Sequence, residues 1–249
     1  MAELLRTGAV FIHVPKCGGN WVREALRDLG LWRCRIGFKH STPERIADVW
    51  QFHRAQFLRH IPTRPDVTPG KLRRAFKFCF VRNPIGWYES WWKFMAGDWH
   101  PWEVGRWHPQ RPIDECGDDD FDRFIENVLR ARPGYVSEMY GWYADGSDFV
   151  GRCETLAADL VEALRRSGTV VDPARLERLE RLAPTNLSPS RRGTPRWNPE
   201  LLRRVAFAES AAIRRFGYVA EVERAYGVSI GAASASAGPS AAGTAGGSA

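Results

Sequence analysis

The segment over residues 11–21, FIHVPKCGGNW, constrains the fold of this chain more than any other part of the sequence. A β-branched and aromatic run ends in Pro-Lys-Cys-Gly-Gly-Asn, and an amphipathic helix pattern follows. Glycines such as Gly18 and Gly19 allow backbone angles that other residues avoid, so successive N–H groups can turn inward toward an anion at the helix N-terminus. We therefore expect a strand, an anion-binding loop and a helix.

This loop differs from a Walker A sequence. That motif reads Gly-x-x-x-x-Gly-Lys-Ser/Thr, with the lysine after the glycines and a hydroxyl group for Mg²⁺. Here Lys16 precedes both glycines, and the residue after them is Asn20. A lysine nevertheless suits a position beside a phosphate, because its charge is compact. The order of residues disfavours an ordinary ATPase or GTPase and keeps a cation beside the expected anion.

A second segment, residues 76–94 with the sequence FKFCFVRNPIGWYESWWKF, again reads as a strand followed by a helix. Its continuous apolar run is typical of a parallel strand that is covered on both faces. Arg82 follows this run, and open α/β sheets bind ligands at the carboxyl ends of their strands. Pro84 suits the first helical turn, and Ser90 lies about two turns beyond Arg82. We expect Arg82 and Ser90 to converge on a second phosphate.

Together the two segments resemble the sulfotransferases that use 3′-phosphoadenosine 5′-phosphosulfate (PAPS), in particular a bacterial and Golgi-type branch. That branch has His-x-Pro-Lys-x-Gly-Gly, followed later by Phe-x-Phe-x-Phe-Val-Arg-Asn-Pro. The resemblance implies a loop that holds the 5′-phosphosulfate, an Arg/Ser pair that holds the 3′-phosphate, and no metal. It assigns the phosphosulfate to Lys16, Cys17, Gly18, Gly19, Asn20 and Trp21, and the 3′-phosphate to Arg82 and Ser90. Family members often have Thr or Ser at the positions of Cys17 and Asn20.

Sulfuryl transfer needs a positioned donor, charge stabilisation at the departing phosphate oxygen, and a base for the acceptor's proton. We expect Lys16 to stabilise the departing oxygen. His40, in IGFKHST, follows an expected strand and precedes a helix, and the resemblance supports it as the general base. Glu154, in GRCETL, is a second candidate for the base, and its position equally suits a helix start. We interpret His13, within the first expected strand, as structural or positioning.

Two further segments bear on the substrates. Arg191, Arg192 and Gly193 lie in a stretch that is rich in turn formers and cations, and they resemble the late basic loop that folds over the nucleotide in sulfotransferases. Trp99, Trp102 and Trp107 fall in an irregular stretch and are suited to line an acceptor pocket. The acceptor is then expected to be a small molecule or glycan with a hydroxyl group.

The order of the elements predicts one α/β domain. We expect strands over residues 8–14, 33–38, 76–81 and 147–152, and helices over residues 19–29, 42–58, 84–96, 119–131, 135–143, 154–167, 172–182 and 198–215. This alternation predicts a mainly parallel central sheet flanked by helices. The resemblance implies a three-layer sandwich like that of P-loop NTPases. The domain is expected over residues 1–230, and the small-residue run 231–249 predicts a disordered tail.

The net charge and the cysteine pattern indicate which kinds of binding partner and which cellular compartment to expect. The formal net charge is +7, but the arginines between residues 165 and 181 alternate with Glu and Leu, a pattern typical of solvated helix faces. No run approaches the roughly 18 apolar residues of a membrane span, and no signal peptide is recognisable. The five cysteines form no Cys-x-x-Cys pair. We expect a cytoplasmic enzyme that binds neither nucleic acid nor a membrane.

Two alternatives to the sulfotransferase remain open. A nucleotide-dependent phosphotransferase would need a divalent metal, and the loop lacks the hydroxyl group that normally binds one. A non-catalytic nucleotide-binding protein of the same fold would bind the donor without turnover. The expected nucleotide product of the sulfotransferase is adenosine 3′,5′-bisphosphate, whereas the phosphotransferase would bind ATP with magnesium.

Overall fold

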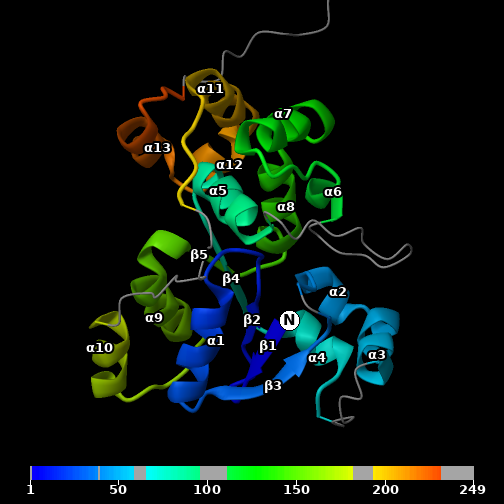
Figure 1. Cartoon of the computed structure of the whole chain (residues 1–249). Helices are drawn as coiled ribbons and strands as arrows, with labels where there is room; N and C mark the ends of the chain where they lie inside the picture. Colours follow the sequence, from blue (N-terminus) through cyan, green and yellow to red (C-terminus); the bar gives the residue numbers. More distant parts are fainter. Residues whose placement is uncertain (1, 39, 59–65, 96–110, 182–192, 231–249) are drawn as a thin grey trace, which may run out of the picture.

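The computed structural model describes residues 2–38, 40–58, 66–95, 111–181 and 193–230 (Figure 1). A five-stranded sheet has the strand order β3-β1-β2-β4-β5. The strands are β1 Ala2–Leu5, β2 Val10–Ile12, β3 Trp32–Ile36, β4 Lys77–Val81 and β5 Phe149–Arg152. The predicted α/β class is confirmed, while the comparison with P-loop NTPases stays a prediction.

Four of the five strands run in the same direction. Strands β2, β4 and β5 pair in parallel, whereas β1 pairs antiparallel with both β2 and β3. Strand β3 therefore points the same way as β2, although the two are separated by β1. The carboxyl ends of β2, β3, β4 and β5 consequently share one edge of the sheet, which is where α/β proteins place ligands.

Strand β1 was not predicted from the sequence. Ala and Glu, which open this strand, are depleted in strands in general. Here Glu3 is buried, and its carboxylate accepts a hydrogen bond of 2.7 Å from Nε1 of Trp32 on β3. This partner comes from a neighbouring strand, so the local sequence gives no sign that Glu3 can be buried in a sheet.

Helices surround the sheet, and several differ from the predicted ranges. They are α1 Gly19–Asp28, α2 Pro43–Ala47, α3 Val49–Leu58, α4 Pro69–Arg74, α5 Pro84–Met95, α6 Arg111–Asp114, α7 Phe121–Ala131, α8 Tyr135–Ala144, α9 Leu156–Arg166, α10 Pro173–Arg181, α11 Pro199–Ala208, α12 Ser210–Arg215 and α13 Val219–Tyr226, with a 3₁₀ turn at Cys153–Thr155. The helix predicted over residues 42–58 divides because Asp48 is extended, with ψ 128°, and accepts a hydrogen bond from the Gln51 N–H. Helices α4, α6 and α13 were not predicted.

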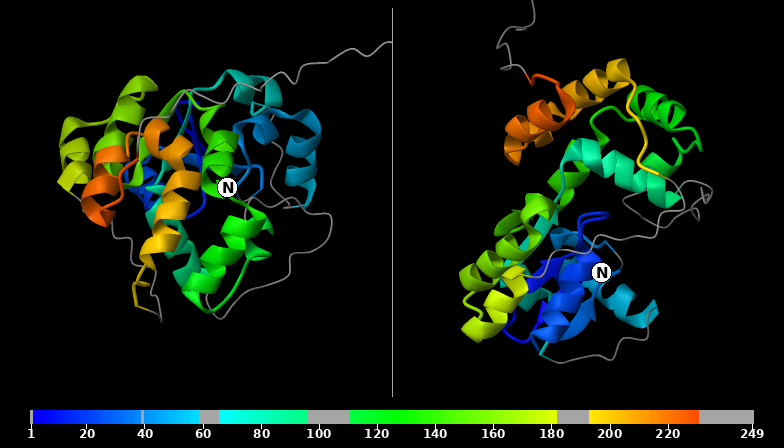
Figure 2. Two further views of the ribbon diagram at one scale, coloured as in Figure 1. Left: turned by 90° about the horizontal axis from the view of Figure 1, so that it is seen from above. Right: turned by 60° about the vertical axis from the view of Figure 1, so that its left-hand side comes forward.

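Two apolar cores cover the two faces of the sheet. Alternate residues of a strand point to opposite faces, so Phe78 and Phe80 pack with α1 and α9, whereas Cys79 and Val81 belong to the core that includes α5, α8 and α11. Strand β4 leads directly toward α5. Helix α5 packs in a group with α7, α8 and α11–α13, and it joins this group to the sheet (Figures 1 and 2). The predicted flanking of the sheet by helices is confirmed.

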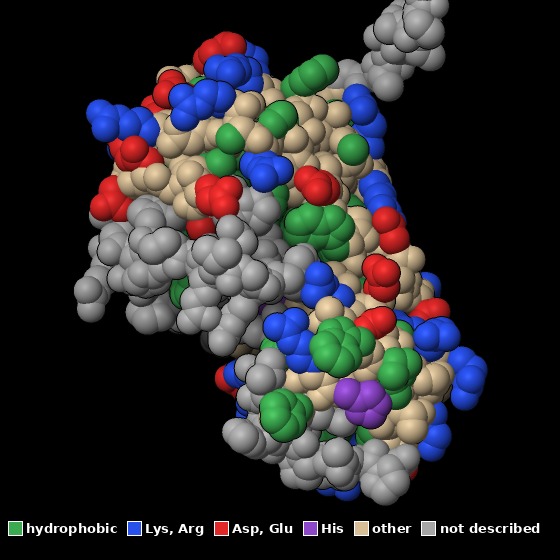
Figure 3. Space-filling view, turned by 90° about the vertical axis from the view of Figure 1, so that its right-hand side faces the viewer, with side chains coloured by type: hydrophobic (Ala, Val, Ile, Leu, Met, Phe, Trp, Pro, Cys, Tyr) green, Lys and Arg blue, Asp and Glu red, His purple; other side chains and the backbone are tan. Residues whose placement is uncertain are grey.

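The outer face of α3 exposes large apolar side chains. Val49, Trp50 and Phe57 are 57%, 71% and 81% exposed, and Figure 3 shows hydrophobic side chains gathered around a histidine over this part of the molecule.

Within the described ranges, no helix combines the length and the apolar character needed to cross a membrane.

Candidate functional site

The predicted anion-binding loop connects β2 with α1. Its two glycines are required for different structural reasons. Gly18 has a left-handed backbone with φ 75°, and a Cβ atom there would lie 2.5 Å from Cδ2 of Leu156. A Cβ atom at Gly19 would lie 2.1 Å from Cδ2 of His13. The loop therefore needs Gly18 for its backbone angle and for a close contact, and it needs Gly19 because the His13 ring lies against it.

Lys16 extends from this loop toward helix α5. Its backbone is left-handed, with φ 60°, a conformation that is uncommon outside glycine. Its Nζ lies 4.3 Å from the centroid of the Phe94 ring. Residues four apart share a helix face, so Phe94 lies on the same face of α5 as Ser90. The Lys16 ammonium group thus reaches the helix face on which the 3′-phosphate residue was predicted.

Arg82 joins the two motifs directly. It follows β4, and its Nη1 donates a hydrogen bond of 3.2 Å to the carbonyl oxygen of Lys16. Ser90 is half-buried in α5, and no other side chain in the described part of the chain bonds to its hydroxyl group. Two segments that are more than 60 residues apart therefore meet at one edge of the sheet.

The other loop residues differ in burial and in side-chain contacts. The Cys17 thiol is buried, donates to the carbonyl oxygen of Pro15 at 3.2 Å, and lies 3.7 Å from the hydroxyl oxygen of Tyr140. Burial raises the pKa of this thiol well above its ordinary value. Its side chain is thus neutral and turned into the protein, which leaves its backbone for an anion. Asn20 is exposed and Trp21 is half-buried, both in the first turn of α1.

His40 lies beside the strand that leads into the loop. It is buried, has a left-handed backbone with φ 62°, and its ring centroid is 4.8 Å from that of His13. Its Nδ1 is 3.1 Å from the carbonyl oxygen of His13. A carbonyl oxygen only accepts, so this contact favours the neutral tautomer with the proton on Nδ1. The Nε2 atom is then the basic nitrogen of the ring.

Glu154 has both carboxylate oxygens engaged by the fold. Oε1 accepts a hydrogen bond of 2.9 Å from the backbone N–H of Asn83, and Oε2 accepts one of 2.8 Å from the Tyr218 hydroxyl group. Asn83 immediately precedes α5, and its Nδ2 donates to Glu221 of α13 at 3.0 Å. These contacts favour a role for Glu154 in fixing the start of α5.

The late basic loop is described only in part. Arg191 and Arg192 lie outside the described residues, as do Trp99, Trp102 and Trp107. Gly193 is described, and the Thr194 hydroxyl group next to it accepts a hydrogen bond of 3.0 Å from Nζ of Lys93. Trp197 then donates from Nε1 to Glu89 at 2.8 Å. The chain that follows Arg192 therefore contacts α5, the helix that carries Ser90.

Sequence reasoning missed the aromatic residues that hold these segments. Trp87 donates from Nε1 to the carbonyl oxygen of Pro15 at 2.9 Å, and Tyr143 donates to the carbonyl oxygen of His40 at 3.0 Å. Tyr140 bonds to the backbone of Arg82. All three side chains are buried, and in the sequence they look like ordinary core residues. Only the spacing of the two tyrosines, three residues apart on α8, signals a shared face.

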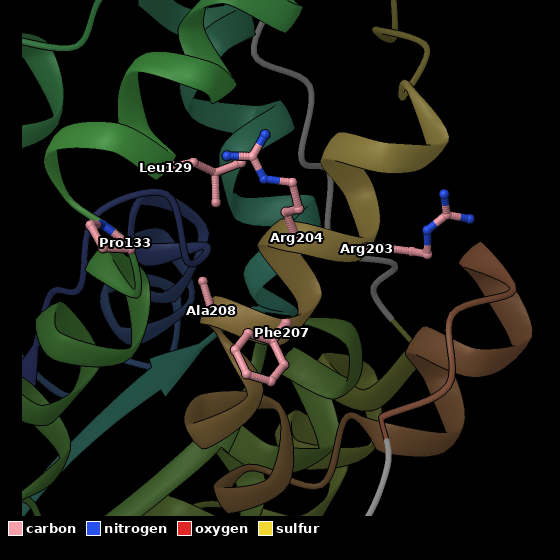
Figure 4. A pocket seen from close by; sticks show the side chains of 6 residues that line it. All are labelled: Leu129, Pro133, Arg203, Arg204, Phe207 and Ala208. Atoms are coloured by element: carbon pink, nitrogen blue, oxygen red, sulfur yellow. The ribbon is translucent and has the colours of Figure 1, made fainter.

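A surface hollow of about 360 Å³ lies elsewhere, between α7 and α11 (Figure 4). It is lined by Leu129, Pro133, Arg203, Arg204, Phe207 and Ala208. None of the predicted site residues lines it. In the ranges that the structure describes, His, Cys, Asp and Glu side chains do not gather in threes as a metal site would require.

Comparison with known protein families gives a match over most of the chain. The sequence model of a family described as "Sulfotransferase family" matches residues 6–216, a range that includes both motifs, His40 and Glu154. Neither the curated proteins nor the solved structures contain a match to the chain.

Proposed function

Because the chain belongs to the sulfotransferase family, we propose that it moves a sulfuryl group from PAPS to a hydroxyl group of a small molecule or glycan. The observation that carries the choice of donor is the hydrogen bond of 3.2 Å from Arg82 to the carbonyl oxygen of Lys16. It brings the second motif against the anion-binding loop. PAPS has phosphates on both the 5′ and the 3′ oxygens of one ribose. Its binding therefore requires two anion sites that are neighbours, as the loop and Arg82 are.

The loop and the start of α1 supply the site for the 5′-phosphosulfate. Gly18 and Gly19 let the loop pack closely against Leu156 and His13, in a form whose N–H groups can approach an anion at the positive end of the helix dipole. Cys17, Asn20 and Trp21 contribute backbone to this cradle. Arg82 and Ser90 hold the 3′-phosphate, and Arg191, Arg192 and Gly193 close over the nucleotide.

Lys16 stabilises the oxygen that leaves. Its contact with the Phe94 ring is partly exposed to solvent, and such a cation–π contact contributes only about 0.5–1 kcal/mol. A phosphate oxygen that gains negative charge is a stronger partner for the ammonium group. The charge stabilisation of the reaction thus falls to Lys16, Arg82 and the loop N–H groups.

His40 removes the proton of the acceptor. Its Nδ1 contact with the His13 carbonyl oxygen favours Nε2 as the basic nitrogen. As Nε2 takes the hydroxyl proton, the acceptor oxygen attacks the sulfur atom in line, and the bond from sulfur to the bridging phosphate oxygen breaks. That oxygen keeps the electron pair and departs with adenosine 3′,5′-bisphosphate. Glu154 remains the alternative base, although the fold already uses both of its oxygens.

We also propose that the enzyme works in the cytoplasm. All five cysteines are free thiols, and those at positions 17, 79, 116 and 153 are buried. Free buried thiols are typical of proteins in a reducing compartment. The domain is proposed to span residues 1–230.

Turnover of labelled PAPS against a panel of sugar and aromatic alcohols tests the reaction, with ATP and Mg²⁺ as the comparison donor. We expect formation of adenosine 3′,5′-bisphosphate that depends on an acceptor. Lys16→Ala should lower this rate by about 100-fold or more, the usual scale for loss of a group that stabilises transition-state charge. Phosphoryl transfer from ATP would favour a phosphotransferase, and binding of PAPS without any turnover would favour a non-catalytic nucleotide-binding protein.

A further inference from the structure

We infer that two buried tyrosines of α8, Tyr140 and Tyr143, set the spacing between the donor site and the general base. The inference rests on the proposed function. Both tyrosines are positioning residues, which act through the backbones of Arg82 and His40.

Tyr140 holds the backbone of Arg82 at both of its polar groups. Its hydroxyl group donates to the Arg82 carbonyl oxygen at 2.7 Å and accepts from the Arg82 N–H at 3.1 Å. The same oxygen lies 3.7 Å from the Cys17 sulfur in the anion-binding loop. Tyr140 is fully buried, and β4 ends one residue before Arg82. The Tyr140 hydroxyl group therefore supplies hydrogen-bond partners for the N–H and C=O groups of Arg82, which lie beyond the end of the strand.

Tyr143 holds the backbone of His40 at one polar group. Its hydroxyl group donates to the His40 carbonyl oxygen at 3.0 Å. His40 has φ 62°, a conformation that is unfavourable for a residue with a side chain. The hydrogen bond to its carbonyl oxygen helps to hold that conformation, on which the direction of the imidazole depends.

Helix α8 is itself fixed at its start. The Glu209 carboxylate accepts hydrogen bonds from the backbone N–H groups of Val136 at 3.0 Å and Ser137 at 2.7 Å, and from the Tyr88 hydroxyl group at 2.6 Å. Glu209 is fully buried. Tyr140 and Tyr143 are three residues apart and share a helix face. The backbones after β3 and β4 are therefore both held by one anchored helix.

The two tyrosines should have separable effects. Tyr140→Phe keeps the ring and frees the Arg82 backbone, so it should weaken binding of adenosine 3′,5′-bisphosphate about tenfold, the effect of one or two lost hydrogen bonds. Binding of adenosine 5′-phosphate, which lacks the 3′-phosphate, should change by less than about threefold. Tyr143→Phe should leave both affinities unchanged, lower kcat about tenfold and shift its pH profile.

The experiment is calorimetric titration of the full chain with both nucleotides, together with kcat against pH for PAPS turnover. Thr169→Val is the matched control, because it removes a buried hydroxyl group that bonds to Thr7 and Ser167 and contacts neither α8, the loop, Arg82 nor His40. Near-UV circular dichroism and melting temperature report whether each variant folds. If Tyr140→Phe fails to fold, the Tyr143→Phe kinetics still test the second half of the inference.

Three results are decisive. Selective loss of bisphosphate affinity in Tyr140→Phe, with a kinetic defect in Tyr143→Phe, supports the inference. Equal losses for both nucleotides in all three variants, or wild-type behaviour of Tyr140→Phe and Tyr143→Phe, overturn it while the proposed function stands. A wild-type protein that fails to bind adenosine 3′,5′-bisphosphate overturns the proposed function, and the inference with it.

Discussion

At the scale of single residues, the two loop glycines are required for different reasons. Gly18 has a left-handed backbone, with φ 75°. Gly19 is required because the His13 ring occupies the space of a side chain. This contact could not be predicted, because it depends on how His13 is turned at the end of β2.

Gly19→Ala should disrupt the loop. The new methyl group would lie 2.1 Å from a His13 ring carbon, so the loop or the ring must move. Overpacking of this kind costs about 1–3 kcal/mol, and we expect at least a tenfold loss of affinity for adenosine 3′,5′-bisphosphate. Urea unfolding and calorimetric titration measure the two effects.

Gly70→Ala is the matched control for this variant. Gly70 lies in α4, and a Cβ atom there has no heavy atom within 4 Å. Alanine suits a helix better than glycine by about 1 kcal/mol, so stability should stay the same or rise. Wild-type affinity and stability in Gly19→Ala would contradict the account of the loop.

Asp114 gives a prediction for pH dependence. Burial raises the pKa of this carboxyl group from 3.8 to about 8. Between these values the folded protein keeps a proton that the unfolded chain releases, so the free energy of unfolding should fall as pH rises from about 4 to about 8. Asp114→Asn, which cannot titrate, should flatten this slope. Urea unfolding at a series of pH values measures it, and identical slopes in the two proteins would refute the prediction.

At the scale of elements, the strand-loop-helix units around the two motifs were predictable, because each depends on local periodicity and on turn residues. Helix α1 begins at Gly19 and α5 at Pro84, as predicted. Boundaries inside long helical patterns were less predictable. The helix predicted over residues 198–215 divides into α11 and α12 at Glu209, whose side chain bonds to α8. Such a break depends on a distant partner.

Glu209→Ala should destabilise the protein strongly. It removes the acceptor of two backbone N–H groups of α8 and of the Tyr88 and Ser137 hydroxyl groups. Unpaired buried donors cost about 1–3 kcal/mol each, and after relaxation we expect a total loss of about 2–4 kcal/mol in the free energy of unfolding. Glu200→Ala removes an exposed carboxylate paired with Arg203 and should cost at most about 1 kcal/mol. Equal effects of the two substitutions would contradict the anchoring of α8.

At the scale of the whole molecule, the meeting of the loop, Arg82 and His40 was predictable from one rule, because each follows a strand whose carboxyl end lies at the same edge. The antiparallel β1 was not predictable, since it depends on Trp32 of β3. Nor was the role of α8, whose tyrosines lie far along the chain from the residues they hold. The three tryptophans expected at the acceptor pocket and the two arginines of the late loop fall outside the described residues.

The central claim is that one site binds a nucleotide with two separate phosphates. Thermal unfolding with adenosine 3′,5′-bisphosphate tests it most directly, with adenosine 5′-phosphate, ADP and ATP with Mg²⁺ as comparators. A ligand at about 100 times its Kd adds roughly 2.7 kcal/mol, which should raise the melting temperature by roughly 5–10 °C. We expect the bisphosphate to stabilise the protein far more than the other nucleotides do. Stabilisation by ATP with Mg²⁺ alone, or by none of the nucleotides, would contradict the account.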